Sequence, residues 1–261
     1  MKKPIIGIIG GTGRMGLMFK VFFEKRGMIV QSASRNTRLT IEKCAETSDV
    51  VIVSVPIEDT IDTIKKIGSL VRKESLLMDF TSIKVKPLET MLEFSKSSVL
   101  GVHPMFGPGI KKLKGQTVVL CKGRGENWFD WVNTFFLKEK ASIRICTAEE
   151  HDRMMVFIQA LTHFNSIAIG HLMKEFNFDI AESAAYSTPV FKLQLEIIKR
   201  IFSQDSSLYS GIIMDNTAVC EILDDYFENY AGLLDTIYKK DKNGFAYYFN
   251  EAATYFNGHL R

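Results

Sequence analysis

A glycine-rich hexapeptide, Gly11-Thr12-Gly13-Arg14-Met15-Gly16, limits what this chain can fold into more than any other feature. It follows an apolar run, Ile5–Ile9, that is typical of a strand, and it opens a stretch, Met15–Arg26, that is typical of a helix. In such a unit the glycines allow a tight turn and the close approach of a pyrophosphate, and the helix start offers free N–H groups to that anion. A purely structural glycine turn is the alternative. The pattern predicts a dinucleotide site at residues 11–16.

Short apolar runs alternate with helical stretches over the first 147 residues. Because parallel neighbours in a sheet need a long crossover, this alternation predicts parallel βαβ units. The uninterrupted apolar run Val50–Val55 is typical of a strand that is covered on both faces. We therefore expect a Rossmann-type α/β domain over residues 1–147. Its other predicted strands are Met28–Ala33, Leu76–Phe80, Ser98–Val102 and Thr117–Cys121.

The pattern changes near Thr147, after which strand-like runs and glycines are scarce. Thr147 followed by Glu149 and Glu150 is typical of a helix start, with a hydroxyl N-cap and acids in the first turn. The stretch from Met154 to Met173 is apolar over most of its surface, which predicts deep burial inside a domain or at a subunit interface. The sequence thus predicts an all-helical domain over residues 148–261, packed on the first domain without a flexible tether.

Composition excludes several classes of protein. The formal net charge of +3 is too small to imply a nucleic-acid partner, and no basic run is interleaved with aromatic residues. No apolar run approaches the roughly 18 residues of a membrane helix, and the N-terminus has no cleavage signal. The cysteines lack disulfide or metal-ligand spacing, so we expect free thiols, no metal and a cytoplasmic location. These cysteines are Cys44, Cys121, Cys146 and Cys220.

The end of the second predicted strand bears on the choice between NAD and NADP. An NAD-binding domain usually carries an acid there for the ribose hydroxyls, but this segment is Ser34-Arg35-Asn36-Thr37-Arg38. A carboxylate would repel a 2′-phosphate, whereas Arg35 and the hydroxyl groups can bind it, so NADP is favoured. If Arg35 only covers the adenine face, NAD is served equally well. Val55 and Pro56 end the next strand and are expected to line the same cleft.

His103 and Ser82 are the candidate catalytic residues. Pro104 biases His103 towards an extended conformation, so the histidine is expected at a strand's carboxyl end, on the edge where the cofactor lies. A histidine there can act as a base or as a hydrogen-bond acceptor, although a structural histidine fits the position equally well. Ser82 follows the strand Leu76–Phe80 and reaches the same edge, where it could orient His103 or the nicotinamide amide. A helix cap is the alternative for Ser82.

Five segments together carry a family resemblance. They are DFTSIK at 79–84, HPMFGP at 103–108, EEHDRMMVFIQALTHF at 149–164, STP at 187–189 and FKLQLEIIKRIFSQD at 191–205. They resemble prephenate dehydrogenases over nearly the whole chain and are more specific than the glycine motif. The resemblance implies oxidative decarboxylation of prephenate to 4-hydroxyphenylpyruvate, with hydride transfer to NAD or NADP, in tyrosine biosynthesis.

The resemblance also implies roles for individual residues. His103 would accept a hydrogen bond from the ring hydroxyl of the substrate. Arg200 would bind a substrate carboxylate through its planar fork, although its helix position alone suggests a surface arginine. His163, on one helical face with Gln159, would lie beside the substrate's side chain; a buried structural histidine is the alternative. Lys192 would be a second anion contact.

Other interpretations remain open at this level. Arogenate, which carries an amino group where prephenate has a keto group, is the closest alternative substrate. The glycine turn also resembles that of deazaflavin-linked NADP reductases, a relation that leaves HPMFGP unexplained, and a non-catalytic NADP-sensing module is a third possibility. The resemblance further implies a stand-alone catalytic unit and a homodimer formed through the helical domain. His151 is expected to cap or pack the junction between the domains, and Lys84 to lie near an anion or at the surface.

Overall fold

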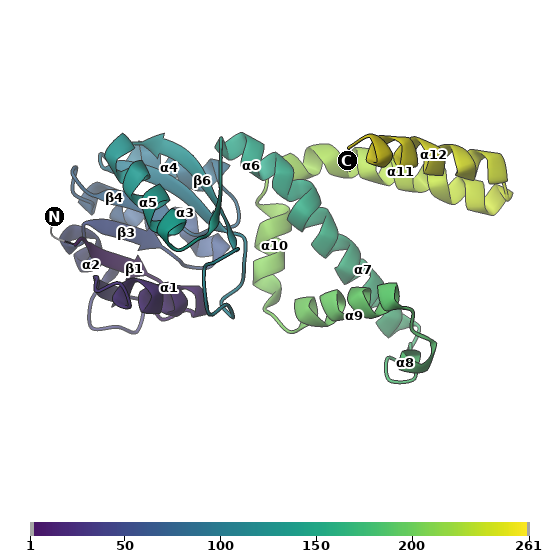
Figure 1. Cartoon of the computed structure of the whole chain (residues 1–261), viewed down its shortest axis with the longest axis horizontal. Coiled ribbons are helices and arrows are strands. Elements are labelled where there is room, and N and C mark those ends of the chain that lie inside the picture. Colours follow the sequence, from purple (N-terminus) through teal and green to yellow (C-terminus); the bar gives the residue numbers. More distant parts are fainter. Residues whose placement is uncertain (1–2, 260–261) are drawn as a thin grey trace. The chain divides into compact units, whose positions relative to one another are not determined.

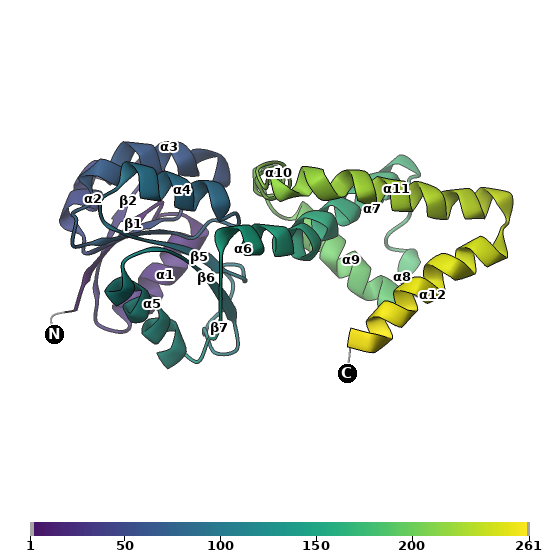
Figure 2. The same cartoon turned by 90° about the horizontal axis from the view of Figure 1, so that it is seen from above.

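The computed structural model describes residues 3–259, and the first part of this range forms a seven-stranded sheet (Figure 1; Figure 2). The strand order is β2-β1-β3-β4-β5-β6-β7, and all neighbours are parallel except β5 and β6. The predicted α/β fold class is therefore confirmed. The strands are β1 (Ile5–Ile9), β2 (Ile29–Ala33), β3 (Val50–Val53), β4 (Leu76–Asp79), β5 (Ser98–Pro104), β6 (Thr117–Arg124) and β7 (Ser142–Cys146).

The predicted strands each begin within one residue of an observed strand. Two features of the sheet were missed. The strand β7 was not predicted, because it is a short edge strand whose side chains are mostly exposed or half-buried. The pairing of β5 with β6 is antiparallel rather than parallel, because the linker at residues 105–116 contains no crossover helix.

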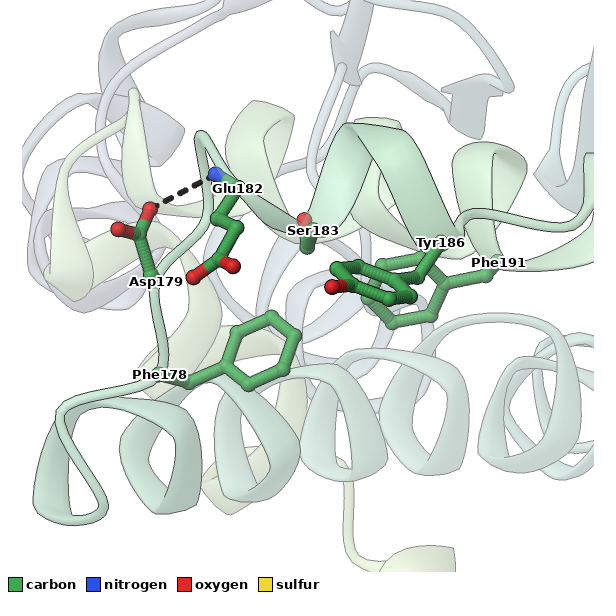
Figure 3. A pocket seen from close by; sticks show the side chains of 6 residues that line it. All are labelled: Phe178, Asp179, Glu182, Ser183, Tyr186 and Phe191. Atoms are coloured by element: carbon green, nitrogen blue, oxygen red, sulfur yellow. Dashed lines mark hydrogen bonds between the residues drawn. The ribbon is translucent and has the colours of Figure 1, made fainter.

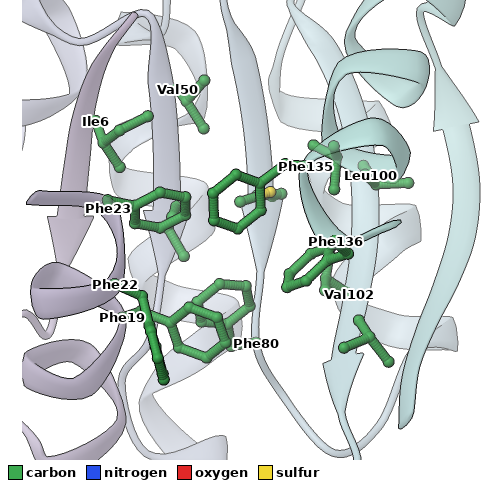
Figure 4. Close-up of a cluster of buried hydrophobic side chains, with 14 of the residues drawn as sticks. Ile6, Phe19, Phe22, Phe23, Val50, Phe80, Leu100, Val102, Phe135 and Phe136 are labelled. Atoms are coloured by element: carbon green, nitrogen blue, oxygen red, sulfur yellow. The ribbon is translucent and has the colours of Figure 1, made fainter. Parts of the chain in front are cut away.

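Helices cover both faces of the sheet, as the continuous apolar strands require. On one face, α1 (Arg14–Glu24) and α5 (Glu126–Lys138) contribute most of the phenylalanine rings that Figure 4 shows over the strands. Phe19 and Phe23 are almost completely buried, and each such ring stabilises the fold by about 1.5–3 kcal/mol. The other face is covered by α2 (Ile41–Thr47), α3 (Ile57–Ile67), η1 (Gly68–Leu70) and α4 (Val85–Phe94).

The alternation of side chains along β5 decides where its histidine points. Leu100 and Val102 belong to the core on the α1 and α5 face, and Val99 belongs to the core on the opposite face. Gly101 faces this opposite side as well, because an ideal Cβ built on it would lie 3.1 Å from Lys84 Cδ. His103 lies two residues further along the strand and therefore shares the side of Gly101.

The helical segment after the sheet begins as predicted. Thr147 caps α6 (Ala148–Met155), and its hydroxyl and the Glu150 carboxylate form a reciprocal capping box. Through residue 216 these helices belong to the same compact unit as the sheet. The next elements are the π-helical turn η2 (Val156–Leu161), α7 (Thr162–Glu175), α8 (Ser183–Tyr186), α9 (Pro189–Phe202) and α10 (Ser206–Met214).

The prediction of deep burial for residues 154–173 is wrong for the single chain. Met154, Phe157 and Leu172 are all more than half exposed. The sequence predicted burial either inside a domain or at a subunit interface. Because these side chains are exposed in the single chain, a subunit interface is the setting in which they would be covered.

A second compact unit begins at Thr217. It consists of α11 (Ala218–Lys239) and α12 (Lys242–His259), joined by a tight turn in which Lys240 adopts a left-handed conformation (φ 54°). No residue of α12 is buried, and most of its aromatic side chains are exposed. Within residues 3–259, no helix combines the length and the apolar character that crossing a bilayer requires.

Candidate active site

The carboxyl ends of β1, β3, β4 and β5 meet at one edge of the sheet, because these strands are parallel to one another. In open α/β sheets, ligands lie outside this edge. The chain segments found there are the glycine turn after β1, the Ser54–Pro56 segment after β3, the Phe80–Ser82 segment after β4 and the end of β5 with His103.

The turn after β1 has no room for a side chain at two of its glycines. Gly10 has a left-handed φ of 83°, and a Cβ built on it would lie 2.2 Å from the carbonyl oxygen of Ser54. A Cβ on Gly16 would lie 2.5 Å from the carbonyl oxygen of Gly10. Helix α1 starts after Gly13 with no side-chain cap and no acid in its first turn. Its N–H groups are therefore available to an anion, and the turn fits a pyrophosphate.

A cleft of about 530 Å³ adjoins this turn. Several residues predicted to bind the cofactor line it, whereas Gly11, Arg14, Met15 and Gly16 shape the turn and are not in its lining. One face of α3, with spacing i, i+3, i+4 and i+7, also lines the cleft and was not foreseen, although α3 follows β3 at this edge. The predicted residues in the lining are Thr12, Gly13, Ser34, Arg35, Val55 and Pro56, and those from α3 are Asp59, Asp62, Thr63 and Lys66.

Arg35 is paired across this cleft. Its side chain is 83% exposed, and Nη2 lies 2.5 Å from Asp59 Oδ2. The neighbouring Ser34 donates its backbone N–H to Thr37 Oγ1 at 2.8 Å. The end of β2 thus has no carboxylate of its own, but α3 supplies one from the opposite side. An exposed pair of this kind exchanges partners easily, because water screens it.

His103 is buried at the end of β5 and is linked to the start of the helical segment. Its Nδ1 lies 2.8 Å from Nε2 of His151, and Nδ1 of His151 lies 2.7 Å from Oδ1 of Asp152. Asp152 also accepts the backbone N–H groups of Lys84 and Val85, at 2.7 and 2.9 Å. His151 therefore does pack at the junction with α6, and in doing so it contacts His103 directly.

Lys84 is neither at the surface nor beside an open anion site. Its side chain is fully buried and forms an ion pair with Asp79, which also accepts from the Thr81 hydroxyl. The ammonium group of Lys84 donates in addition to the carbonyl oxygen of Val102, 3.1 Å away. This contact fixes the strand immediately before His103. This pair was not foreseen, although Asp79 precedes Lys84 by only five residues, because the sequence does not show that both side chains are buried.

Burial sets the protonation of both histidines. It lowers the pKa of His103 well below its usual range, and the charge of Lys84 and the charge that His151 gains when it is protonated act in the same direction. Burial also lowers the pKa of His151, although the hydrogen bond to Asp152 opposes this effect. Both rings are therefore neutral near pH 7.

A second group of predicted residues lies around Arg200 on α9. A Cβ built on Gly107, in the loop after His103, would lie 3.8 Å from Arg200 Nη2. The charge of Arg200 also reaches His163 and Tyr209, whose rings meet edge to face at 4.9 Å. The pKa of His163 is lowered, chiefly by burial and then by Arg200. Lys192 is exposed eight residues earlier on α9, about 12 Å away along the helix axis.

Two buried polar atoms near this group have no protein partner. They are Gln159 Oε1 and His163 Nδ1, one helical turn apart. The turn η2, which contains Gln159, has π-helical geometry, a feature that is frequent at functional sites. Buried polar atoms are normally satisfied, so these two atoms indicate a polar ligand or ordered water beside Arg200.

Ser82, the other predicted catalytic residue, is half-buried at the sheet edge. The ring nitrogen Nδ1 of His103 contacts His151 instead of Ser82.

A further cavity, of about 490 Å³, lies between α8 and the start of α9. Figure 3 shows Phe178, Tyr186 and Phe191 around it, with Asp179 accepting the backbone N–H of Glu182. It contains none of the predicted site residues. In the described range 3–259, no cluster of His, Cys, Asp and Glu side chains could hold a metal ion, and the cysteines are free thiols.

Two family models match the chain. One is described as prephenate dehydrogenase, nucleotide-binding domain, and matches residues 27–145; the other is described as prephenate dehydrogenase, dimerization domain, and matches residues 147–251. The compact units of the structure instead divide between Asn216 and Thr217. The expected domain boundary between residues 147 and 148 stays a prediction.

Curated relatives match over most of the chain. The T-protein of Haemophilus influenzae is 36% identical over 96% of this chain and 67% of its own length. The probable arogenate/prephenate dehydrogenase of Methanocaldococcus jannaschii is 36% identical over 98% of this chain and 62% of its own length. The chain thus spans about two-thirds of the length of these relatives.

Solved structures share the fold. Prephenate dehydrogenase from A. aeolicus, in complex with hydroxyphenyl propionate and NAD+, has a TM-score of 0.75 at 16% identity and covers 97% of both chains. Synechocystis arogenate dehydrogenase has a TM-score of 0.69 at 17% identity, and the match covers 98% of this chain and 99% of that one.

Proposed function

Since this chain belongs to the prephenate dehydrogenase family, we propose that it converts prephenate to 4-hydroxyphenylpyruvate and carbon dioxide with reduction of NAD(P). The observation that carries the proposal is the setting of one loop. The loop starts at the buried His103 on the carboxyl edge of the sheet, and Arg200 lies against it at Gly107. A hydrogen-bond acceptor and a cation are the groups that a hydroxylated dicarboxylate requires.

The residues present fit a dinucleotide. The glycine turn would hold the pyrophosphate, because glycine at positions 10 and 16 lets the backbone close tightly and the start of α1 offers free N–H groups. Thr12, Val55 and Pro56 line the cleft on which the rest of the molecule would lie. A nicotinamide bound there supplies the hydride acceptor for the reaction. Ser82, half-buried at the same edge, is proposed to hold the nicotinamide amide or the substrate.

His103 acts as an acceptor rather than as a net base. A hydride leaves the carbon that bears the ring hydroxyl, the ring carboxylate departs as carbon dioxide, and its bonding electrons complete the aromatic ring. The hydroxyl proton stays on the product phenol, so no net proton is released. His103 therefore has to orient and polarise the hydroxyl group by accepting its hydrogen bond. A histidine kept neutral by burial is suited to this role.

Arg200 is proposed to bind a substrate carboxylate, and His163 to contact the substrate's side chain. The unpartnered Gln159 Oε1 and His163 Nδ1 support a polar ligand beside Arg200. An ammonium group would meet the positive charge of Arg200 here, which favours the keto group of prephenate over the amino group of arogenate. Lys192, which is exposed and lies farther along α9, would act only as an outer contact for the incoming anion.

For the cofactor we propose NADP in preference to NAD. The segment at residues 34–38 contains no carboxylate, which supports a 2′-phosphate contact at Ser34 and Arg35. The ion pair between Arg35 and Asp59 opposes this preference, because the phosphate would have to replace Asp59. The balance between these two contacts decides the cofactor.

A homodimer in the cytoplasm is the proposed state. Large apolar side chains are more than half exposed on the helices after residue 147, and a second copy of the chain would cover them. Free thiols suit a reducing compartment. The exposed apolar side chains are Phe157, Phe176, Tyr186, Val190, Leu193 and Phe249. Sedimentation velocity at micromolar concentration tests the dimer, and a single species of monomer mass would contradict it.

One assay tests the proposed function directly. The purified full chain is incubated with prephenate or arogenate, each with NAD and with NADP, and reduced nicotinamide is followed by absorbance. We expect prephenate with NADP to give the highest kcat/KM of the four combinations. Release of carbon dioxide in equal amount to reduced nicotinamide must accompany it. Binding of NADP without turnover of either substrate would instead support the sensing module.

A further inference from the structure

Three buried side chains are connected in series at the end of β5. Asp152, His151 and His103 are each no more than 3% exposed. The contact from Asp152 Oδ1 to His151 Nδ1 is 2.7 Å, and the contact from His151 Nε2 to His103 Nδ1 is 2.8 Å. The chain of contacts uses both nitrogens of His151 and leaves one nitrogen of His103, Nε2, outside it.

The donors and acceptors in this series can be assigned in one consistent way. Asp152 accepts the backbone N–H groups of Lys84 and Val85, so its carboxylate is held as an acceptor. His151 Nδ1 must then carry the proton. Because burial lowers the pKa of His151, the ring is neutral and its Nε2 is an acceptor. The proton in the second contact therefore belongs to His103 Nδ1, and Nε2 of His103 is unprotonated.

We infer that Asp152 and His151 are positioning residues that fix the tautomer and the ring orientation of His103, so that Nε2 is presented as a hydrogen-bond acceptor. This inference rests on the proposed function, since it explains how His103 can receive the ring hydroxyl. The opposite tautomer would present an N–H group to that hydroxyl and could not polarise it. A histidine fixed by a second histidine and an acid is thus prepared before substrate binds.

The surroundings of His103 support this assignment. The titratable groups that face it are His151 and Asp152 from α6, and the ion pair between Asp79 at the end of β4 and Lys84 at the start of α4. Lys84 is occupied by Asp79 and by the Val102 carbonyl oxygen. The acceptor within hydrogen-bond distance of His103 Nδ1 is His151 Nε2.

A purely structural role for His151 makes a different prediction. In that case His151 satisfies buried polar groups at the junction, and either tautomer of His103 would support the same activity. Nuclear magnetic resonance separates the two, because long-range ¹H–¹⁵N correlation reports which ring nitrogen of each histidine carries a proton. The chain has 5 histidines, so uniform ¹⁵N labelling is tractable, and loss of a ring in His103→Asn and His151→Phe assigns the signals.

The first measurement uses the full-length protein without substrate near pH 7. We expect His103 to be protonated at Nδ1 alone and His151 to be protonated at Nδ1 alone. A His103 ring protonated at Nε2 would overturn the inference, whatever the activity of the protein. If the tautomers are as expected but prephenate is not oxidised, the inference about protonation stands and the proposed function fails.

The second measurement uses His151→Phe, which keeps a ring of similar size and removes the acceptor. We expect His103 to shift towards the Nε2–H tautomer, and kcat to fall about 10²-fold with KM changed less than about threefold. Asn216→Ala is the matched control, because Asn216 is buried and donates to the backbone carbonyl oxygen of Asp152. It should keep the wild-type tautomer and kcat, even if stability falls. Unchanged kcat and tautomer in His151→Phe would overturn the inference.

Discussion

The two ends of the sheet's carboxyl edge handle charge in opposite ways. At the cofactor end, Arg35 and Asp59 form an ion pair whose side chains are 83% and 35% exposed. At the other end, Lys84 and Asp79 form a pair that is fully buried next to the strand that carries His103. The open pair can release its partner to a ligand at little cost, whereas the buried pair is held in one geometry. The exposed pair therefore suits ligand binding, and the buried pair suits the orientation of the strand that carries His103.

The largest expected effect is at the buried end, in catalysis. His103→Asn removes the acceptor for the ring hydroxyl, so we expect kcat to fall about 10²–10⁴-fold with little change in KM. Steady-state kinetics with prephenate measures both parameters. His171→Asn, the same change at an exposed site on α7, is the control and should keep wild-type rates. A similar loss in both variants would remove the special role of His103.

The next effect is on stability. Lys84→Met leaves the Asp79 carboxylate buried without its cation, so we expect the free energy of unfolding to fall by about 3–5 kcal/mol in urea denaturation. Lys43→Met removes an exposed pair with Glu46 and should change it by less than about 0.5 kcal/mol. Adding Asp79→Asn to Lys84→Met should recover part of the loss. If Lys84→Met and Lys43→Met lowered the free energy of unfolding equally, the buried pair would contribute no more to stability than the exposed pair.

Substrate binding through Arg200 should give a smaller effect. Arg200→Ala removes a charge-assisted contact that contributes about 1.5–3 kcal/mol, so the KM for prephenate should rise roughly 10–100-fold while kcat stays within a few-fold of wild type. Lys199→Ala, at the neighbouring exposed position, serves as the control. A fall in kcat with constant KM would place Arg200 in the chemistry rather than in binding.

The pH dependence of stability sharpens the same contrast. Folding lowers the pKa of His103 and of His151 below the unfolded value of about 6.5, so the unfolded chain binds more protons there. Stability is therefore full above about pH 6.5 and is lost as the pH falls towards the lowered values. Urea midpoints between pH 5 and 8 measure this slope. The double variant His103→Asn with His151→Phe should have a flatter profile, and an unchanged slope would contradict the assignment.

The smallest effect is expected at the open end. Asp59→Asn removes the competitor for Arg35, so the preference for NADP over NAD should rise, by at most about fivefold, since such exposed pairs contribute 1 kcal/mol or less. Stability should change by a similarly small amount. Asp62→Asn, on the same face of α3, controls for general loss of negative charge in the cleft. An equal gain in both variants would mean that total charge, rather than release of Arg35, sets the preference.

Much of the fold follows from local patterns. The glycine turn, the apolar strands and the Thr147 cap depend on spacing of a few residues, and all three lie where the sequence predicts them. The edge strand β7 was missed because its half-exposed pattern is weak. The exposure of Phe157 was missed because an apolar helix does not reveal whether its own chain or another one covers it.

The sequence by itself determined that a dinucleotide turn, a sheet edge and a histidine at a strand end occur in that order along the chain. Only the tertiary structure decided that His103 contacts His151, that Lys84 pairs with Asp79 and that Arg35 pairs with Asp59. The physical reason is range. Periodicity and capping act over one or two helical turns, whereas the His103–His151 and Arg35–Asp59 contacts join elements whose meeting depends on how the sheet and its helices pack. Lys84 and Asp79 are only five residues apart, but their complete burial depends on the same packing.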